Sequence, residues 1–114
     1  MQVYTFQLTK LENLIFSDIP YLDTTVKSGY WQLAPSWEIV MGVKSGKITE
    51  AEYTEQYWAM LEWRYETYPE FFEWLITHEK IAFGCYCPAG KFCHRHIITK
   101  FLSHITDIDY CGEL

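Results

Sequence analysis

Hydrophobic and polar residues follow two kinds of spacing along this chain, and the first kind predicts strands. The segments VYTFQL (3–8) and YLDTTV (21–26) are rich in β-branched and aromatic residues, which favours extended structure. The segment KIAFGCYC (80–87) is largely apolar, and we expect its residues 81–86 to form a central strand buried on both faces, as in a parallel sheet. The stretch ITDIDYCGEL (105–114) is expected to add a short edge strand.

Elsewhere the apolar residues recur three and four positions apart, which is typical of helices with one buried face. A short helix is expected between Ser36, which can cap its start, and Gly46, which suits its end. A longer helix is expected after the sequence TEAE, in which Thr49 and Glu52 can form a capping box. Its apolar positions predict a buried face that includes Tyr53, Tyr57 and Leu61.

Two further helices complete the pattern. Thr67 and Glu70 repeat the capping device, and Pro69 suits an early helical position. The last helix begins near Cys93, and one apolar face is expected from Ile97, Ile98, Phe101, Leu102 and Ile105. Strands that alternate with helices predict a single small α/β domain over residues 1–114, with a mostly parallel sheet.

Composition narrows the classes of partner. The chain has 114 residues, 49% of them hydrophobic, and a formal net charge of −6. No apolar run approaches the ~20 residues that span a bilayer, and no signal peptide is recognised, so we expect a cytoplasmic protein without membrane contact. Non-specific nucleic-acid binding needs a basic face, which this charge balance argues against. In a reducing compartment the four cysteines are expected to be thiols or metal ligands, without bridges.

The sequence CYCPAGKFCHRH (85–96) concentrates the candidate chemistry, with three of the four cysteines, two of the four histidines and an arginine. If a strand ends near Cys87 and a helix begins near Cys93, PAGKF is a βα loop, where ligands of parallel sheets bind. Gly90 allows close backbone approach, and Lys91 and Arg95 supply positive charge. Helical spacing places His94 toward the core and His96 on the solvent side.

Three interpretations compete for the sulfur atoms. Zinc usually needs four tetrahedral ligands, and the spacing C-x-C-x5-C-H supplies no second pair, so we predict no structural zinc and no cofactor. A metal-binding cysteine/histidine domain remains an alternative. A reactive thiolate suits Cys93, because a helix N-terminus and Arg95 both lower a thiol pKa, and Cys87 can share that pocket. Cys85 is interpreted as a small buried hydrophobic residue.

The segment DTTVKSG (23–29) is expected to face the same edge of the sheet, since it follows the second strand. Asp23 can orient His94 or a ligand hydroxyl, and Lys27 and Ser28 can contact an anion. The alternative is an ordinary turn in which Asp23 caps the backbone. Both interpretations stay open at this point.

The order of the blocks VYTFQL, DTTVKSG…LAPSWEIV…GKITEAEYTEQY and CYCPAGKFCHRHII resembles domain-of-unknown-function family 488, in particular small versions often found in phage genomes. The resemblance implies a Rossmann-like three-layer α/β fold and, for a phage protein, the cytoplasm of the host cell. It also implies site positions at Asp23, Ser28, Pro35, Ser36, Cys87, Cys93, His94 and Arg95. Many relatives have an arginine soon after the aspartate, where this chain has threonines and then Lys27.

These observations predict a pocket for a small anionic ligand, such as a nucleotide or another phosphorylated molecule, with Arg95 as its main anion contact. In an enzyme, Cys93 or Cys87 is the nucleophile and His94 the acid/base; a binding protein uses the same pocket without a reaction. A third class is a protein-interaction module that uses aromatic side chains as anchors. This class would be favoured by an exposed patch formed by Trp31, Trp37, Trp58 or Trp63.

Overall fold

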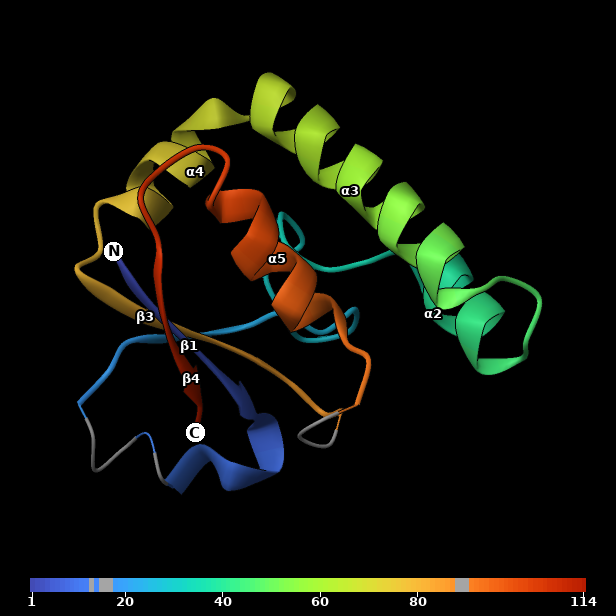
Figure 1. Cartoon of the computed structure of the whole chain (residues 1–114), viewed down its shortest axis with the longest axis horizontal. Helices are drawn as coiled ribbons and strands as arrows, with labels where there is room; N and C mark the ends of the chain where they lie inside the picture. The colour runs from blue at the N-terminus through green and yellow to red at the C-terminus, as the bar shows by residue number, and fades with distance from the viewer. Residues whose placement is uncertain (13, 15–17, 88–90) are drawn as a thin grey trace.

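The strands form one sheet in the order β2-β3-β1-β4, and every neighbouring pair is parallel (Figure 1). The computed structural model describes residues 1–12, 14, 18–87 and 91–114. Its strands are β1 (Gln2–Gln7), β2 (Tyr21–Asp23), β3 (Lys80–Cys85) and β4 (Asp109–Glu113). Its helical elements are the 3₁₀ turn η1 (Leu8–Lys10) and the helices α2 (Trp37–Lys44), α3 (Glu50–Thr67), α4 (Pro69–Ile76) and α5 (His94–Leu102).

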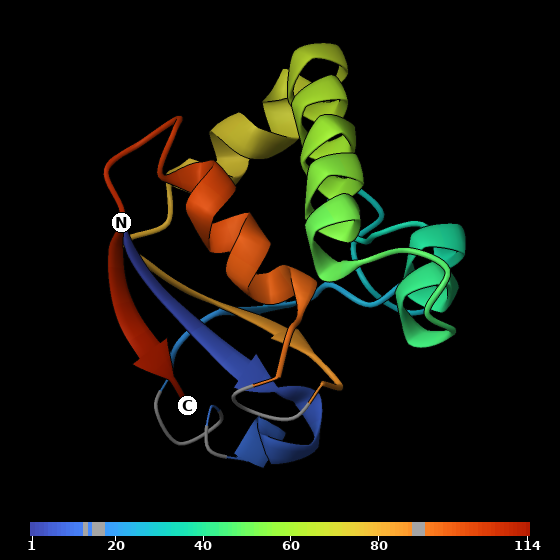
Figure 2. The same ribbon diagram turned by 45° about the vertical axis from the view of Figure 1, so that its right-hand side comes forward.

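Two hydrophobic clusters cover the two faces of the sheet. On one face, Val3, Ile81 and Phe83 pack with apolar residues of α2 to α5. On the other face, Phe6 and Ala82 pack with Leu8 and Leu11 of the segment around η1. Figure 2 shows α3 and α5 on one side of the strands and η1 on the other. The Rossmann-like three-layer α/β fold is therefore confirmed.

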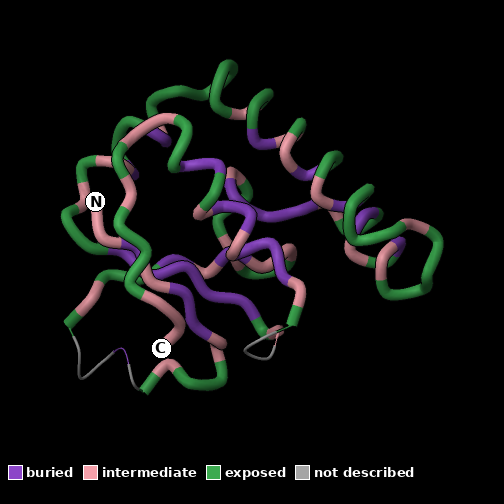
Figure 3. Tube along the Cα trace, viewed as in Figure 1, coloured by how far each residue is buried: buried purple, intermediate pink, exposed green. Residues whose placement is uncertain are grey.

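The central strand β3 is buried from Ile81 to Cys85, as predicted, and Figure 3 shows this burial in the middle of the sheet. The prediction also included Tyr86, which lies beyond the strand and is exposed. Its side chains alternate, so that residues 81, 83 and 85 face the large helices. Gly84 faces the other way, where the ring of Phe6 occupies the place that a side chain at position 84 would take. The same alternation aims Cys85 into the helical layer.

Helix capping follows the predictions in two places and departs from them in one. The hydroxyl of Ser36 accepts a hydrogen bond from the Ile39 amide at 3.3 Å. Thr49 and Glu52 form the expected capping box, with both bonds at 3.0 Å. The predicted capping at Thr67 is wrong, because α3 extends through that residue, and Tyr68 precedes α4 without a side-chain cap. No helix in the described part of the chain is long and apolar enough to cross a bilayer.

Candidate functional site

A cavity of about 480 Å³ lies where the DTTVKSG segment meets the end of β3. The cavity lies beyond the carboxyl ends of the neighbouring parallel strands β2 and β3, at the edge of the sheet where ligands bind in open α/β folds. The wall of the cavity is largely apolar and comprises Val26, Pro35, Val40, Val43, Tyr53 and Phe92.

The DTTVKSG segment is a tightly bonded turn that Asp23 holds together. One carboxylate oxygen of Asp23 accepts hydrogen bonds from the amide and hydroxyl of Thr25 at 2.8 and 2.7 Å, and the other accepts from the Ser28 hydroxyl at 2.7 Å. Burial alone would raise the pKa of Asp23, but these hydrogen bonds outweigh it and lower the pKa. Gly29 is needed because a Cβ there would lie within 2.6 Å of the Asp23 and Thr25 backbone. The geometry favours the turn-capping interpretation of Asp23.

His94 is buried as predicted, and its hydrogen bonds fix its tautomer. The Thr24 hydroxyl donates to the carbonyl of Gly84 at 2.9 Å. The Nε2 of His94 lies 2.9 Å from the Thr24 carbonyl and 2.8 Å from the Thr24 hydroxyl oxygen, and a carbonyl can only accept, so Nε2 carries the proton. The lone pair is then on Nδ1, which lies 3.7 Å from the sulfur of Cys93. Burial lowers the pKa of His94 to about 4, so the ring is neutral at neutral pH.

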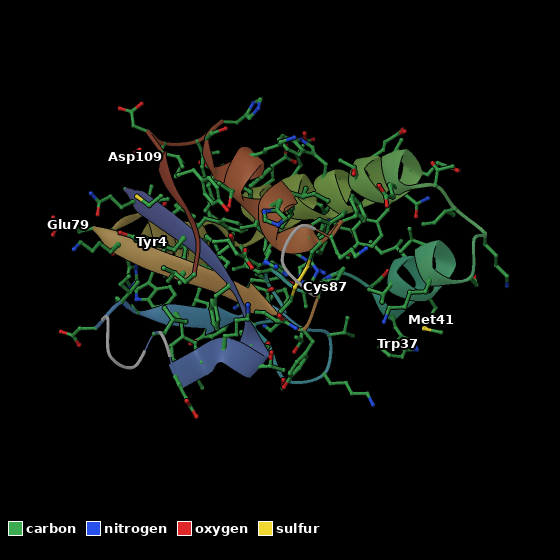
Figure 4. The ribbon with its side chains drawn as sticks, turned by 60° about the horizontal axis from the view of Figure 1, so that its bottom comes forward. Tyr4, Trp37, Met41, Glu79, Cys87 and Asp109 are labelled. Atoms are coloured by element: carbon green, nitrogen blue, oxygen red, sulfur yellow. A yellow bond between two sulfur atoms is a disulfide. The ribbon has the colours of Figure 1, made fainter. Side chains whose placement is uncertain are left out.

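The sulfur atoms of Cys85 and Cys93 meet at the floor of the cavity (the yellow bond in Figure 4), although their Cα atoms are 7.9 Å apart, beyond the range of about 4.4–6.8 Å that disulfides usually span. The sequence predicted four cysteines without bridges and did not anticipate this contact. The contact arises because Cys85 points into the helical layer and Cys93 is the N-cap of α5 above it, a proximity that their spacing in sequence does not reveal. Cys87, which also lines the cavity, and Cys111 are free.

Arg95 lies beneath this floor instead of in the cavity. Its side chain is fully buried, and Nε and Nη2 donate to the carboxylate of Glu113 at 3.2 and 2.7 Å. Nη1 donates to the Cys87 carbonyl and to the Cys85 sulfur, both at 2.9 Å. Burial would raise the pKa of Glu113, but the hydrogen bonds from Arg95 and Thr5 outweigh it and lower the pKa. The guanidinium therefore supports the loop and the sheet, and its donors face these protein acceptors instead of the cavity.

The other predicted site residues divide into two groups. The cavity brings together Lys27, Ser28, Cys87, Cys93 and His94. Asp23, Ser36, Lys91 and Arg95 are not among its described lining residues, and Gly90 lies outside the part of the chain that the structure describes. His96 is half-buried, not fully on the solvent side.

Sequence reasoning missed several side chains that shape the site. Tyr53 was expected only on the buried face of its helix, but it also lines the cavity. Lys44 and Trp37 reach the cavity from α2. Thr24 orients His94, and Glu113 pairs with Arg95. The only signal for Glu113 was an acidic residue within the expected edge strand.

Comparison with known proteins gives one family. A family model described as "Active DUF488-N3 subclade" (DUF488-N3a) matches residues 15–106, which is most of the chain and includes both loops of the cavity. No curated protein and no solved structure matches significantly. Because the match covers well over half of the chain and agrees with the blocks that suggested the resemblance, this protein belongs to the DUF488 family.

Proposed function

We propose that the cavity binds a small ligand with a planar apolar part and an anionic group, as a nucleotide has. The observation that carries this proposal is the charge of the lining. The chain has 15 acidic residues and only nine lysines and arginines. Nevertheless, two lysines, Lys27 and Lys44, and no acidic residue are among the described residues that line the cavity. This local excess of positive charge favours an anion.

The walls of the cavity suit the apolar part of such a ligand. A volume of about 480 Å³ lies within the usual range of small-molecule sites. Tyr53, Phe92 and Trp37 offer aromatic surface, and the ammonium of Lys27 lies 5.8 Å from the centre of the Trp37 ring. Burial keeps the pKa of Tyr53 well above its ordinary value, so its hydroxyl remains a hydrogen-bond donor at neutral pH.

The description of the family as an active subclade supports a reaction in addition to binding. In the catalytic version of the proposal, Cys87 is the nucleophile, since it is the free cysteine among the described residues of the cavity. Cys93, the other candidate, has its sulfur in contact with that of Cys85. Iodoacetamide labelling tests the position of Cys87. We expect bound ligand to protect Cys87 from alkylation while Cys111, which is exposed on β4, stays reactive.

The binding proposal is tested by calorimetry with nucleoside monophosphates, the corresponding nucleosides and inorganic phosphate. Lys27→Ala and Lys44→Ala are each expected to weaken a nucleotide about 10- to 100-fold, the scale of a charge-assisted hydrogen bond, and to leave a nucleoside unaffected. Lys47→Ala is the matched control, because Lys47 is exposed just after α2 and does not line the cavity. Failure of every nucleotide to bind, or equal effects in all three variants, rejects the proposal.

A second candidate function is protein binding, which the exposure of large aromatic side chains favours. Trp31 and Trp63 are 52% and 57% exposed, and both rings contact Tyr68, at 5.1 and 5.9 Å between centroids. We propose a second copy of the chain as the first partner to test. Sedimentation of wild-type protein should then show a concentration-dependent dimer that Trp31→Ala and Trp63→Ala abolish. Trp37→Ala, which removes an exposed tryptophan at the cavity, should leave it intact; a monomer at all concentrations rejects this partner.

A further inference from the structure

Two sulfur atoms and one ring nitrogen converge at the floor of the cavity. One ligand atom each from Cys85, Cys93 and His94 lies within 4.8 Å of the others, and all three residues are buried. They come from the end of β3, the N-cap of α5 and the first residue of α5. Thiolate and imidazole are the ligands that zinc prefers in proteins.

The hydrogen bonds of His94 leave its other nitrogen available to a metal. Because Nε2 donates to Thr24, the unprotonated Nδ1 is the atom that faces Cys93. Histidines that bind metals in proteins almost always donate their other ring N–H to a carboxylate, carbonyl or water. The Thr24 carbonyl supplies this second contact here, so the imidazole is held in the tautomer and orientation that a metal requires.

The charges around the cluster fit a divalent cation. The sulfur of Cys85 accepts a hydrogen bond from Nη1 of Arg95 at 2.9 Å. The charge of Arg95 is already balanced by Glu113, so it cannot neutralise two thiolates as well. Two buried thiolates without a counter-charge are unfavourable, whereas two thiolates and one divalent ion together are neutral. Metal binding would thus release two thiol protons to solvent.

The spacing of the two cysteines accommodates an ion between the sulfurs. Their Cα atoms are 7.9 Å apart, beyond the range of about 4.4–6.8 Å that disulfides usually span. Two thiolates bound to one tetrahedral zinc at about 2.3 Å stand roughly 3.8 Å apart, so each sulfur needs only a small displacement from its contact with the other.

We propose that, when Cys85 and Cys93 are in the dithiol form, these two residues and His94 bind a zinc-class divalent ion whose fourth coordination position opens to the cavity. All three ligands line the cavity, so the open position of the ion faces the space through which a small molecule arrives. Three protein ligands with one open position is the arrangement of zinc sites that act on a bound water or substrate. The spacing of cysteines and histidines along the sequence argued against a closed structural zinc site with four ligands. That argument did not consider a site with three ligands, one of which is Cys85 at the end of β3.

Cobalt provides the direct test, because its spectrum reports ligand number and type. The full chain, reduced with a phosphine and stripped of metal by a chelator, is titrated with Co²⁺. We expect one equivalent to bind, with the visible bands of tetrahedral Co²⁺ and the near-ultraviolet charge-transfer band of two thiolates, and Zn²⁺ to displace it. Weak octahedral absorption, or less than half an equivalent of bound Co²⁺, would overturn the proposal without needing any variant.

Cysteine variants then assign the ligands. Cys85→Ser and Cys93→Ser should each halve the charge-transfer intensity and weaken binding at least tenfold, and circular dichroism checks that each variant is folded. Cys111→Ser is the matched control, since this exposed cysteine lies outside the cluster, and it should bind like wild type. Cys87→Ser should also bind like wild type; loss of metal in this variant would show a closed four-ligand site and reject the open position.

This inference goes beyond the proposed nucleotide site and can fail independently of it. Calorimetry on chelator-treated protein measures the contacts of Lys27 and Lys44 without metal. The cobalt titration, in turn, is done without any organic ligand.

Discussion

Replacing Glu113 by glutamine is expected to destabilise the protein by about 3 kcal/mol, because it removes the counter-charge of a fully buried guanidinium. Arg95 has no exposed surface, and its two contacts with Glu113 measure 2.7 and 3.2 Å. Removing one partner of a buried ion pair typically costs about 3–5 kcal/mol. The side chain of Glu113 is 22% exposed, so water can partly replace the lost charge, and we expect the lower end of that range.

Urea denaturation followed by circular dichroism measures this loss directly. A change of about 3 kcal/mol is a large part of the ~5–15 kcal/mol that stabilises a domain of this kind, and it should lower the melting temperature by roughly 10–20 °C. Asp109→Asn is the control, since it removes an exposed carboxylate from the same strand and should change stability by no more than about 0.5 kcal/mol.

A double variant separates the lost charge from the lost packing. Arg95→Met combined with Glu113→Leu removes both charges and keeps much of the volume, so it should recover most of the stability that Glu113→Gln loses. The reasoning is refuted if Glu113→Gln is within about 0.5 kcal/mol of wild type. It is equally refuted if the double variant is no more stable than the single one.

Three further variants and conditions test other parts of the fold. Gly84→Ala should cost about 1–3 kcal/mol by urea denaturation, because the added methyl group meets the Phe6 ring, and Phe6→Leu in the same chain should restore part of it. Thr49→Ala should cost about 1 kcal/mol through loss of the capping box, with an unchanged near-ultraviolet spectrum as the check on packing. Because the pKa of Glu113 is lower in the folded protein, the unfolded chain binds a proton at this carboxylate more readily. The stabilisation that ionised Glu113 provides is therefore complete above the ordinary glutamate pKa of 4.5 and is lost as the pH falls below that value. Stability measured from pH 7 to pH 3 should therefore fall less steeply in Glu113→Gln, and parallel curves would contradict the assignment.

Features with a local cause could be predicted from the sequence. The caps at Ser36 and Thr49 depend on residues three positions apart, and both form as expected. The central position of β3 followed from its apolar composition, because a strand covered on both faces has no polar side. The burial of His94 followed from helical periodicity. The capping prediction at Thr67 failed because nothing local stops α3 before that residue.

Most of the site has no local cause and could not be predicted. The partner of Arg95 is 18 positions away in a strand on the far side of β1, and its identity depends on the order of the strands. The tautomer of His94 depends on Thr24, which reaches it only because β2 pairs with β3 in parallel register. The sequence could place charged and sulfur-bearing residues near one edge of the sheet, but packing decides which of them face the cavity and which face each other.

The central place of β1 has a consequence for how the chain folds. β1 is the first strand, yet its two neighbours are β3 and β4, so Gln2 pairs with both Lys80 and Asp109. Contacts between such distant residues require large loops to close first, and folding rates fall as the average separation of contacts grows. The capped helix α3 can form early, whereas β1 keeps two open hydrogen-bonding edges until late. We therefore expect refolding in milliseconds to seconds and a transient tendency to aggregate through these edges, which dilution should reduce.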